Sequence, residues 1–529
     1  MKTARTPLVR LLQQSYQKAF RETNPLPPAS GEPVEGGLSR KHFLRNIALG
    51  APALMLPDFL QAGTTITRPG GDPVKVAIVG AGIAGLNACN VLSRTPGLDI
   101  TIYEGSNRAG GRIFTARNKL GKNITTELGA EFIDTNHKEM FRLVGQYKLD
   151  IIDCGKDITD NDLEHHTYFF GGAHREEKAV VAEFKKMIPK LQKDRADGKD
   201  EVKGAKLDKQ SLQAYLATYT GLSPWFKDLL YWAFTAEFGM EASDLNCLNF
   251  IDIVGLNTEE GFEIFGNSDE RYKVKGGNET LIDALVKDFG SQIRYAHKLQ
   301  KVTKAGAETV LHFENGTTAQ AHYVIIAIPL TLVRKVKFEL AAKMPDGKQY
   351  MIDHYDYGTN SKFLLGFKDR IWRKQGKSGY VINETIQNGW DNSQLQNKNT
   401  GDAGYTVFLG GKAGKEMADT DALRNNLLDG LEKVIKGIKQ TYNDNHGVFN
   451  WSEYPFVQGS YACIQKGQWF RIDTAAMMAP VEQIYFAGEH CSEAFQGFME
   501  GGAETGRMAA EAILEVIAVA QPAQQAEMG

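Results

Sequence analysis

The segment over residues 74–112 constrains the fold of this chain more than any other. A short apolar stretch, 74–79, is followed by GAGIAG over 80–85 and then by a helical run of small and apolar residues. In such a βαβ unit the first glycine permits a tight strand-to-helix turn, the second lets a pyrophosphate approach the backbone, and the third lets the helix pack closely on the strand. A second strand over 99–103 ends at Glu104, where the unit places its ribose-binding acid. The pattern predicts dinucleotide binding, the alternative being a glycine turn in an ordinary βαβ unit.

A second glycine pair, Gly110 and Gly111, stands beside Arg112. Backbone that a ligand can approach closely, next to a guanidinium, suits a further contact with a pyrophosphate. The extended phrase from GAGIAG to YEGSNRAGGR resembles the FAD fingerprint of the flavin amine oxidase superfamily. NAD dehydrogenases are not expected to carry the GGR element, so the resemblance implies FAD as the cofactor.

Composition excludes several classes of function. The 529 residues, 42% hydrophobic and 24% charged, predict two or three globular domains. A formal net charge of -3 gives no electrostatic basis for binding nucleic acid or an anionic membrane. The five cysteines are widely spread without a CxxC pair, so neither a disulfide framework nor a metal site is predicted. No apolar run approaches the roughly 18 to 20 residues of a membrane span.

The first 73 residues are predicted to form an arm and a linker. Residues 1–20 place leucines and aromatic residues near helical spacing, which is typical of an amphipathic arm, and 24–37 are rich in proline and glycine. Residues 39–45, SRKHFLR, resemble a twin-arginine export signal, although Lys41 replaces the second arginine and the basic pair lies far from the start. Two locations therefore stay open: the periplasm, or the cytoplasm with a retained arm.

The predicted fold class is α/β and α+β, with a Rossmann-type FAD-binding domain that is discontinuous in sequence, a mixed-sheet substrate domain and a helical insertion. Residues 156–221 alternate charged and apolar positions, which is typical of a solvated helical surface. Strands over 293–302, 310–314 and 320–328, with a hairpin turn at Asn315 and Gly316, should return the chain to the nucleotide domain. The predicted domains are 74–135 with 270–335 and 450–520 for FAD, 136–269 for the insertion and substrate entrance, and 336–449 for the substrate.

The phrase NSKFLLGFK carries Lys362 on a predicted strand. Lys362 should share one face with Leu364 and Gly366, while Phe363 and Phe367 take the other. A lysine on such a strand usually faces solvent. The phrase, however, resembles the strand of monoamine, polyamine and L-amino acid oxidases whose lysine holds a water against flavin N5, which implies a catalytic role for Lys362.

The phrase IYFAGEHCSEAFQGFMEGGAETG near the C-terminus is similar to the closing FAD motif of flavin amine oxidases. Its last glycines open a predicted helix, whose N-terminus would stabilise negative charge on the reduced flavin by about 0.3 to 1 kcal/mol. In monoamine oxidases a cysteine before an aromatic residue forms the covalent flavin bond, and here that position is Ser460. The resemblance therefore implies noncovalent FAD. On a regular strand Cys463, three residues on, would point to the opposite face and be a poor substitute.

The same resemblance assigns the site residues. Tyr461 and Phe498 would be the aromatic walls between which the substrate amine passes, the alternative being plain core aromatics. The expected cofactor contacts are Gly80, Gly82, Ile83, Ala84, Gly85, Glu104, Gly105, Gly111, Arg112, Gly129, Ala130, Glu131, Phe132, Val302, Trp451, Gly488, Glu489, Gly497, Phe498 and Met499. The expected catalytic residues are Lys362, Tyr461 and Phe498, and the expected substrate contacts are Phe132, Tyr461, Gly497 and Phe498.

The substrate is the least determined feature. L-amino acid oxidases carry an arginine that clamps the substrate carboxylate, but this chain has Phe132 there, and no other arginine can be named from the sequence. Asp134 aligns roughly with an acid that polyamine oxidases use for a distal ammonium. The leader and the phrase ELGAEFID nevertheless look most like bacterial L-amino acid oxidases. This resemblance favours the oxidation of L-amino acids by oxygen to 2-oxo acids, ammonia and hydrogen peroxide. We expect the protein to be a homodimer.

Three alternatives stay open. The first is a primary amine or polyamine oxidase, and the second is a flavin dehydrogenase that uses an acceptor other than oxygen. Lys362 with Tyr461 and Phe498 argues against the dehydrogenase. The third is a binding protein that keeps the fold without redox chemistry, and the complete phosphate-binding phrases argue against it.

Overall fold

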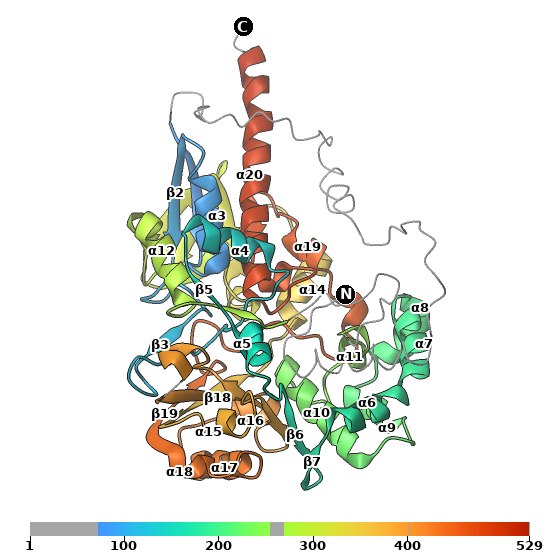
Figure 1. The fold of residues 1–529 in the computed structure, drawn as a ribbon. Coiled ribbons are helices and arrows are strands. Elements are labelled where there is room, and N and C mark those ends of the chain that lie inside the picture. The colour runs from blue at the N-terminus through green and yellow to red at the C-terminus, as the bar shows by residue number, and fades with distance from the viewer. Residues whose placement is uncertain (1–71, 254–268, 400, 528–529) are drawn as a thin grey trace, which may run out of the picture.

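The computed structural model describes residues 72–253, 269–399 and 401–527, with side chains up to residue 518. The arm and twin-arginine-like segment expected before residue 72 therefore lie outside the described residues. Figure 1 shows a parallel sheet and its helices at the top, a second large sheet at the lower left and a helical subdomain at the lower right. The helix α20 (Met499–Glu527) rises from the middle of the molecule.

The nucleotide domain is built on a parallel sheet of five strands ordered β20-β13-β1-β2-β9. These strands come from three separated parts of the chain, so the sheet is discontinuous in sequence. The predicted strands over 74–79 and 99–103 are found with nearly the same bounds. The strands are β1 (Val74–Val79), β2 (Leu98–Tyr103), β9 (Ile293–Arg294), β13 (Tyr323–Ile326) and β20 (Ile484–Phe486).

Glycines allow the elements around β1 to approach closely. A Cβ on Gly85 in α3 (Ile83–Leu92) would lie 1.9 Å from the carbonyl oxygen of Gly80, and one on Gly506 of α20 would lie 2.1 Å from that of Ala84. Helix α3 is thus held between the strand-to-helix turn and α20. Gly85 has the packing role predicted for the third glycine of the motif.

A smaller sheet, ordered β12-β11-β10-β14, contains the predicted hairpin, with Gly316 at φ 82°. The single strand expected over 320–328 is two strands, because Ala321 pairs with Thr309 in this sheet whereas Tyr323 pairs with Val76 in the parallel sheet. An apolar run alone cannot reveal such a change of sheet. The strands are β10 (Leu299–Ala305), β11 (Glu308–Phe313), β12 (Thr318–Ala321) and β14 (Lys337–Phe338).

The substrate region contains a mixed sheet of seven strands ordered β19-β15-β18-β17-β16-β6-β7. Two of them, β6 and β7, come from 136–269, which was expected to be a helical insertion, because β6 pairs in parallel with β16. The strands are β6 (Thr167–Phe170), β7 (Ala173–Arg175), β15 (Ser361–Phe367), β16 (Val381–Asn383), β17 (Asn388–Asp391), β18 (Ala403–Leu409) and β19 (Tyr442–Asn450). Short pairs are formed by β3 (Thr115–Arg117) with β4 (Thr125–Glu127) and by β5 (Ile151–Asp153) with β8 (Tyr272–Val274).

Most of the remaining part of 136–269 is helical, as the charge pattern predicted, and its apolar side chains form a separate core around Phe226, Phe234 and Phe250. Its helices are α5 (Cys154–Asp160), α6 (Glu177–Lys185), α7 (Ile188–Gly198), α8 (Glu201–Asp208), α9 (Leu212–Ala217), α10 (Pro224–Phe238) and α11 (Cys247–Ile253). Two further helices, α4 (Lys138–Gln146) and α12 (Glu279–Phe289), belong to the nucleotide domain. Later in the chain lie α14 (Asp346–His354) and α17 (Asp421–Glu432).

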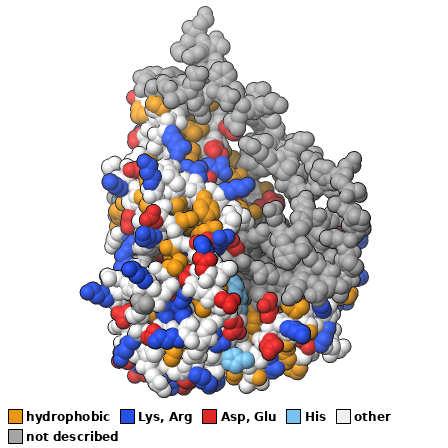
Figure 2. Space-filling model, viewed as in Figure 1, with side chains coloured by type: hydrophobic (Ala, Val, Ile, Leu, Met, Phe, Trp, Pro, Cys, Tyr) orange, Lys and Arg blue, Asp and Glu red, His pale blue; other side chains and the backbone are white. Residues whose placement is uncertain are grey.

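The surface agrees with the near-neutral composition. Figure 2 shows acidic and basic side chains interspersed over the described part of one face, without a patch of a single sign. None of the helices in the described ranges is long and apolar enough to cross a membrane. All five cysteines are buried thiols.

The packing of Gly85 can be tested with Gly85→Ala. The added methyl group would overlap the carbonyl oxygen of Gly80, so we expect a loss of about 1 to 3 kcal/mol in the free energy of unfolding. Gly145→Ala is the matched control, because its Cβ meets nothing within 4 Å at an exposed position of α4. Chemical denaturation of both variants without cofactor checks this, and equal stability of the two variants would contradict the packing role.

Candidate active site

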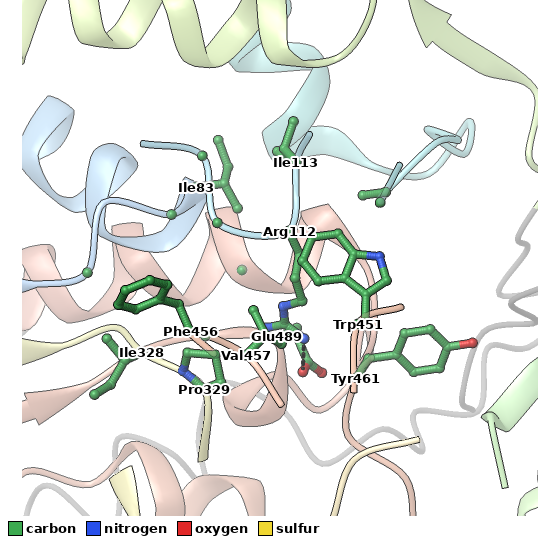
Figure 3. A pocket seen from close by; sticks show the side chains of 18 of the residues that line it. Ile83, Arg112, Ile113, Ile328, Pro329, Trp451, Phe456, Val457, Tyr461 and Glu489 are labelled. Carbon is green, nitrogen blue, oxygen red and sulfur yellow. Dashed lines mark hydrogen bonds and ion pairs between the residues drawn. The ribbon is translucent and has the colours of Figure 1, made fainter. Parts of the chain in front are cut away.

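One elongated cavity collects nearly all of the predicted site residues. It runs from the turn between β1 and α3 to the seven-stranded sheet. Its lining includes Lys362, Tyr461 and Phe498 together with every expected cofactor contact except Gly85 and Val302. Figure 3 shows Ile328, Pro329 and Phe456 at one side, Arg112 and Glu489 in the middle, and Trp451 and Tyr461 at the other side.

The two exceptions have different explanations. Gly85 faces the strand, as described above. Val302 is fully buried in the core between β10 and its neighbours, while Leu299 and Gln300 of the same segment line the cavity. The structure therefore does not bring the Val302 side chain to the cavity.

The nucleotide end is shaped by Glu104 and Gly82. The Glu104 carboxylate accepts hydrogen bonds from the backbone N–H of Ala81 (2.8 Å) and of Ser106 (2.7 Å), and so fixes the turn to the end of β2. Gly82 is the N-cap of α3 and has no side chain to cap the helix. A Cβ on Gly82 would meet no protein atom within 4 Å, so a side chain there would only fill the cavity. An open helix N-terminus beside free space fits the pyrophosphate of a dinucleotide.

An ion pair joins the first and last motifs. Arg112 donates to Glu489 (2.8 Å) and to the carbonyl oxygen of Ser460 (2.9 Å), and the dashed line in Figure 3 marks the ion pair. Glu489 also accepts the backbone N–H of Gly497 at 2.8 Å. Burial raises the pKa of Glu489, but Arg112 and this N–H lower it further, so the pKa lies below its usual value. Arg112 thus holds the C-terminal motif in place as well as lining the cavity.

Lys362 is buried on β15 instead of facing solvent. Its ammonium donates to the carbonyl oxygens of Glu127 (3.1 Å) and Gly129 (2.9 Å) and to the Glu131 carboxylate (2.7 Å). An ammonium has three N–H donors. A water held by Lys362 would therefore share or displace one of these contacts.

Lys273 is a residue of this cluster that the sequence did not single out. Its ammonium donates to Glu131 at 2.9 Å, so one buried carboxylate lies between two lysines. Burial raises the pKa of Glu131, but Lys273 and Lys362 lower it further, to below its usual value. Beside them, burial raises the pKa of Glu127 to about 7. Two lysine side chains thus share the Glu131 carboxylate at the end of the cavity that contains Lys362, and Glu127 beside them is partly ionised near neutral pH.

The aromatic residues are held by different contacts. Tyr461 donates its hydroxyl to the carbonyl oxygen of Glu237 at 2.6 Å, and Phe498 packs edge-on against His137. Ser460 donates to the side-chain oxygen of Asn360 at 2.7 Å and lines the cavity, whereas Cys463 lies in the helical core outside the lining. Cys463 is therefore poorly placed to replace the missing thiol.

The cavity lining includes several residues that the motifs did not indicate. Asp134 does not line the cavity, because its carboxylate accepts the backbone N–H of Glu270 at 2.8 Å, and it is Glu270 that lines the cavity. The seven-stranded sheet adds residues outside any recognised phrase, namely Asn388, Trp390 and Phe408. The alternation of side chains along β17 predicts that Asn388 and Trp390 share one face of the strand. It does not predict that this face lines the cavity.

The chain is similar to known proteins along most of its length. A family model described as flavin containing amine oxidoreductase matches residues 83–514. A putative L-amino-acid oxidase YobN of Bacillus subtilis is 24% identical over 467 residues, covering 82% of this chain and 93% of the relative. Polyamine oxidase 4 of Oryza sativa subsp. japonica is 24% identical over 474 residues, covering 86% of this chain and 93% of the relative.

Solved structures share the fold. Cyclohexylamine oxidase from Brevibacterium oxydans superposes with a TM-score of 0.72 at 20% identity, covering 84% of this chain and 99% of that chain. Putrescine oxidase with bound putrescine superposes with a TM-score of 0.69 at 16% identity, covering 85% and 100%. The cavity fits the FAD that the homologues use. On the extent of the family match, this chain belongs to the flavin-containing amine oxidoreductase family and acts on CH–NH2 groups.

Proposed function

We propose that the chain is an FAD-dependent oxidase that converts L-amino acids to 2-oxo acids, ammonia and hydrogen peroxide. The observation that carries the proposal is that Lys362, Tyr461 and Phe498 line the same cavity as the glycine turns and Arg112. The similarity to a putative L-amino-acid oxidase over 82% of the chain supports the amino acid class.

The cavity residues can favour the reaction in two ways. Bound FAD supplies the acceptor for the hydride of the amine-bearing carbon. Aromatic walls at Tyr461 and Phe498 disfavour a charged ammonium, which lowers the pKa of a bound amine and favours the neutral form that can lose hydride. Lys362, fixed by Glu131, orients a water next to the reacting carbon, and no side chain needs to act as a nucleophile.

A second candidate is a primary amine or polyamine oxidase. The described cavity lining contains two arginines, Arg108 and Arg112, and both already donate hydrogen bonds to protein oxygens. This occupation of both arginines favours a substrate without a carboxylate. Residues 254–268, outside the described ranges, contain neither arginine nor lysine. Among the described residues that line the cavity, an amino acid substrate would therefore need a carboxylate anchor other than arginine.

The substrate class can be tested by anaerobic bleaching of the bound flavin. The panel contains L-amino acids, D-amino acids, putrescine, spermidine and benzylamine, followed by absorbance near the flavin maximum. We expect bleaching by L-amino acids and return of the colour, with peroxide, when air is admitted. Bleaching by amines alone would establish the second candidate, and bleaching by none of the panel would contradict both.

The role of Lys362 can be tested with Lys362→Met. Glu131 keeps Lys273 as a partner in this variant, so the fold and the flavin content should be retained. We expect flavin reduction or reoxidation to slow by roughly 10²-fold, the lower end for a positioned proton-transfer group. Stopped-flow measurement of both half-reactions checks this. Lys368→Met, at an exposed residue just after β15, is the control, and equal rates in the two variants would refute the role.

The linkage of the cofactor gives a further prediction. Because Ser460 stands where a covalent bond would need a thiol and Cys463 lies outside the cavity lining, acid precipitation should release yellow FAD into the supernatant. Absorbance of the supernatant and pellet measures the release. Flavin that stays with the precipitated protein would show a covalent link.

A further inference from the structure

Two residues of β17 that line the cavity carry buried polar atoms without a hydrogen-bond partner among the described residues. Asn388 and Trp390 are 1% and 5% exposed, and both line the cavity. Neither amide atom of Asn388 nor the indole nitrogen of Trp390 forms a hydrogen bond with the described residues. An unpaired buried polar group costs about 1 to 3 kcal/mol. Two residues at alternate positions of one strand carry three such atoms. This indicates a hydrogen-bonding partner that the described part of the protein does not supply.

The register of the sheet places these residues beside Lys362. Asn388 pairs with Phe408, and Phe408 pairs with Lys362, so the three form a row across β17, β18 and β15. Neighbouring strands lie about 4.8 Å apart, which puts the backbone of Asn388 about 10 Å from that of Lys362. The ring of Trp390 is closer, with its centroid 5.4 Å from the Lys362 ammonium and 5.8 Å from that of the Phe132 ring. The unpaired groups therefore lie at the substrate end and not at the nucleotide end.

The chemistry of the unpaired groups is mainly that of donors. The Asn388 amide offers two N–H groups and Trp390 offers one, against a single acceptor, the Asn388 oxygen. The nearest charged cluster contains two lysines, Lys273 and Lys362, and one carboxylate between them. Glu270 also lines the cavity and is a further carboxylate, besides Glu131, that a bound anion would have to avoid. This arrangement suits an oxygen acceptor on the substrate.

We propose that Asn388 and Trp390 bind a carboxylate or carbonyl oxygen carried next to the amine-bearing carbon of the substrate. The proposal rests on the proposed oxidase function and names the residues that would recognise the carboxylate of an α-amino acid, or the carbonyl of its amide or ester. The proximity of Trp390 to Lys362 sets the position, because Lys362 marks the reacting edge and the oxygen must lie near it. Two uncharged side chains thus take the place of the arginine that is absent at Phe132.

The first test uses wild-type holoenzyme and compounds that share one side chain. L-Leucine, L-leucinamide, L-leucine methyl ester and 3-methylbutylamine are compared, with the corresponding phenylalanine and lysine series, by anaerobic flavin reduction. We expect the amine without a carbonyl to need at least tenfold higher concentration for half-maximal reduction. Preference for the acid alone identifies a carboxylate, and equal use of the amide and ester identifies a carbonyl. If the plain amine reduces flavin equally well, the proposal is overturned while the oxidase function stands.

The second test uses Asn388→Leu, which keeps the branch at Cγ and replaces both unpaired amide atoms by methyl groups. We expect the concentration for half-maximal reduction by the carbonyl-bearing compound to rise at least tenfold, with that for the plain amine unchanged. Phe408→Leu is the matched control, because it changes the shape of the same row without removing a hydrogen-bonding group, and it should affect both compounds alike. Equal effects of Asn388→Leu on both compounds would reject recognition by the amide.

Trp390→Phe keeps the inference testable if Asn388→Leu does not fold with flavin. It removes one N–H donor and retains most of the ring, and we expect a smaller loss in the same direction, again confined to carbonyl-bearing compounds. An unchanged preference in Trp390→Phe would reject its role as a donor. Absence of flavin reduction by every compound with wild-type protein would instead refute the oxidase function itself.

Discussion

The ion pair between Arg112 and Glu489 is the interaction on which the cavity depends. It joins residues 377 positions apart, and Glu489 is held further by the N–H of Gly497 while Arg112 reaches the carbonyl of Ser460. Breaking a buried pair by removing one partner costs about 3 to 5 kcal/mol, since the other charge is left without compensation. The pair therefore fixes where the last helix begins and where the segment carrying Tyr461 runs. Ligand contacts from both ends of the chain converge because of it.

A second buried cluster sets the electrostatics at the opposite end. Glu131 would be costly to bury alone, and a single lysine would only neutralise it. With both Lys273 and Lys362 on the same carboxylate, Glu131 has two partners, and its hydrogen bond holds the amino group of Lys362 in one position. The strand β15 is buried along its whole length because it lies between β18 and β19, so its lysine does not face solvent. The charge of the cluster is a property of three segments that meet only in the folded chain.

Local patterns predicted the parts of the structure that depend on neighbouring residues. The strand, glycine turn and helix after residue 74 follow from backbone geometry within one unit, and the two faces of β15 follow from alternation. The change of sheet at His322 and the addition of β6 to the substrate sheet depend on pairing with distant strands, which periodicity does not encode. Lys273, Asn388 and Trp390 belong to no phrase, and only tertiary contacts bring them to Glu131 or the cavity.

The absence of an arginine at Phe132 need not exclude amino acid substrates. An arginine clamp supplies charge and two parallel N–H groups in one side chain. In this chain the same two requirements are met by different residues: the lysine pair around Glu131 provides positive charge, while Asn388 and Trp390 provide N–H donors without partners. Because the charge is shared with Glu131 and does not belong to the donor side chains, such a site should hold a carboxylate less tightly than an arginine would and discriminate less against a neutral carbonyl. Substrate selection would then depend more on the aromatic shape formed by Phe132, Trp390 and Phe408 than on charge.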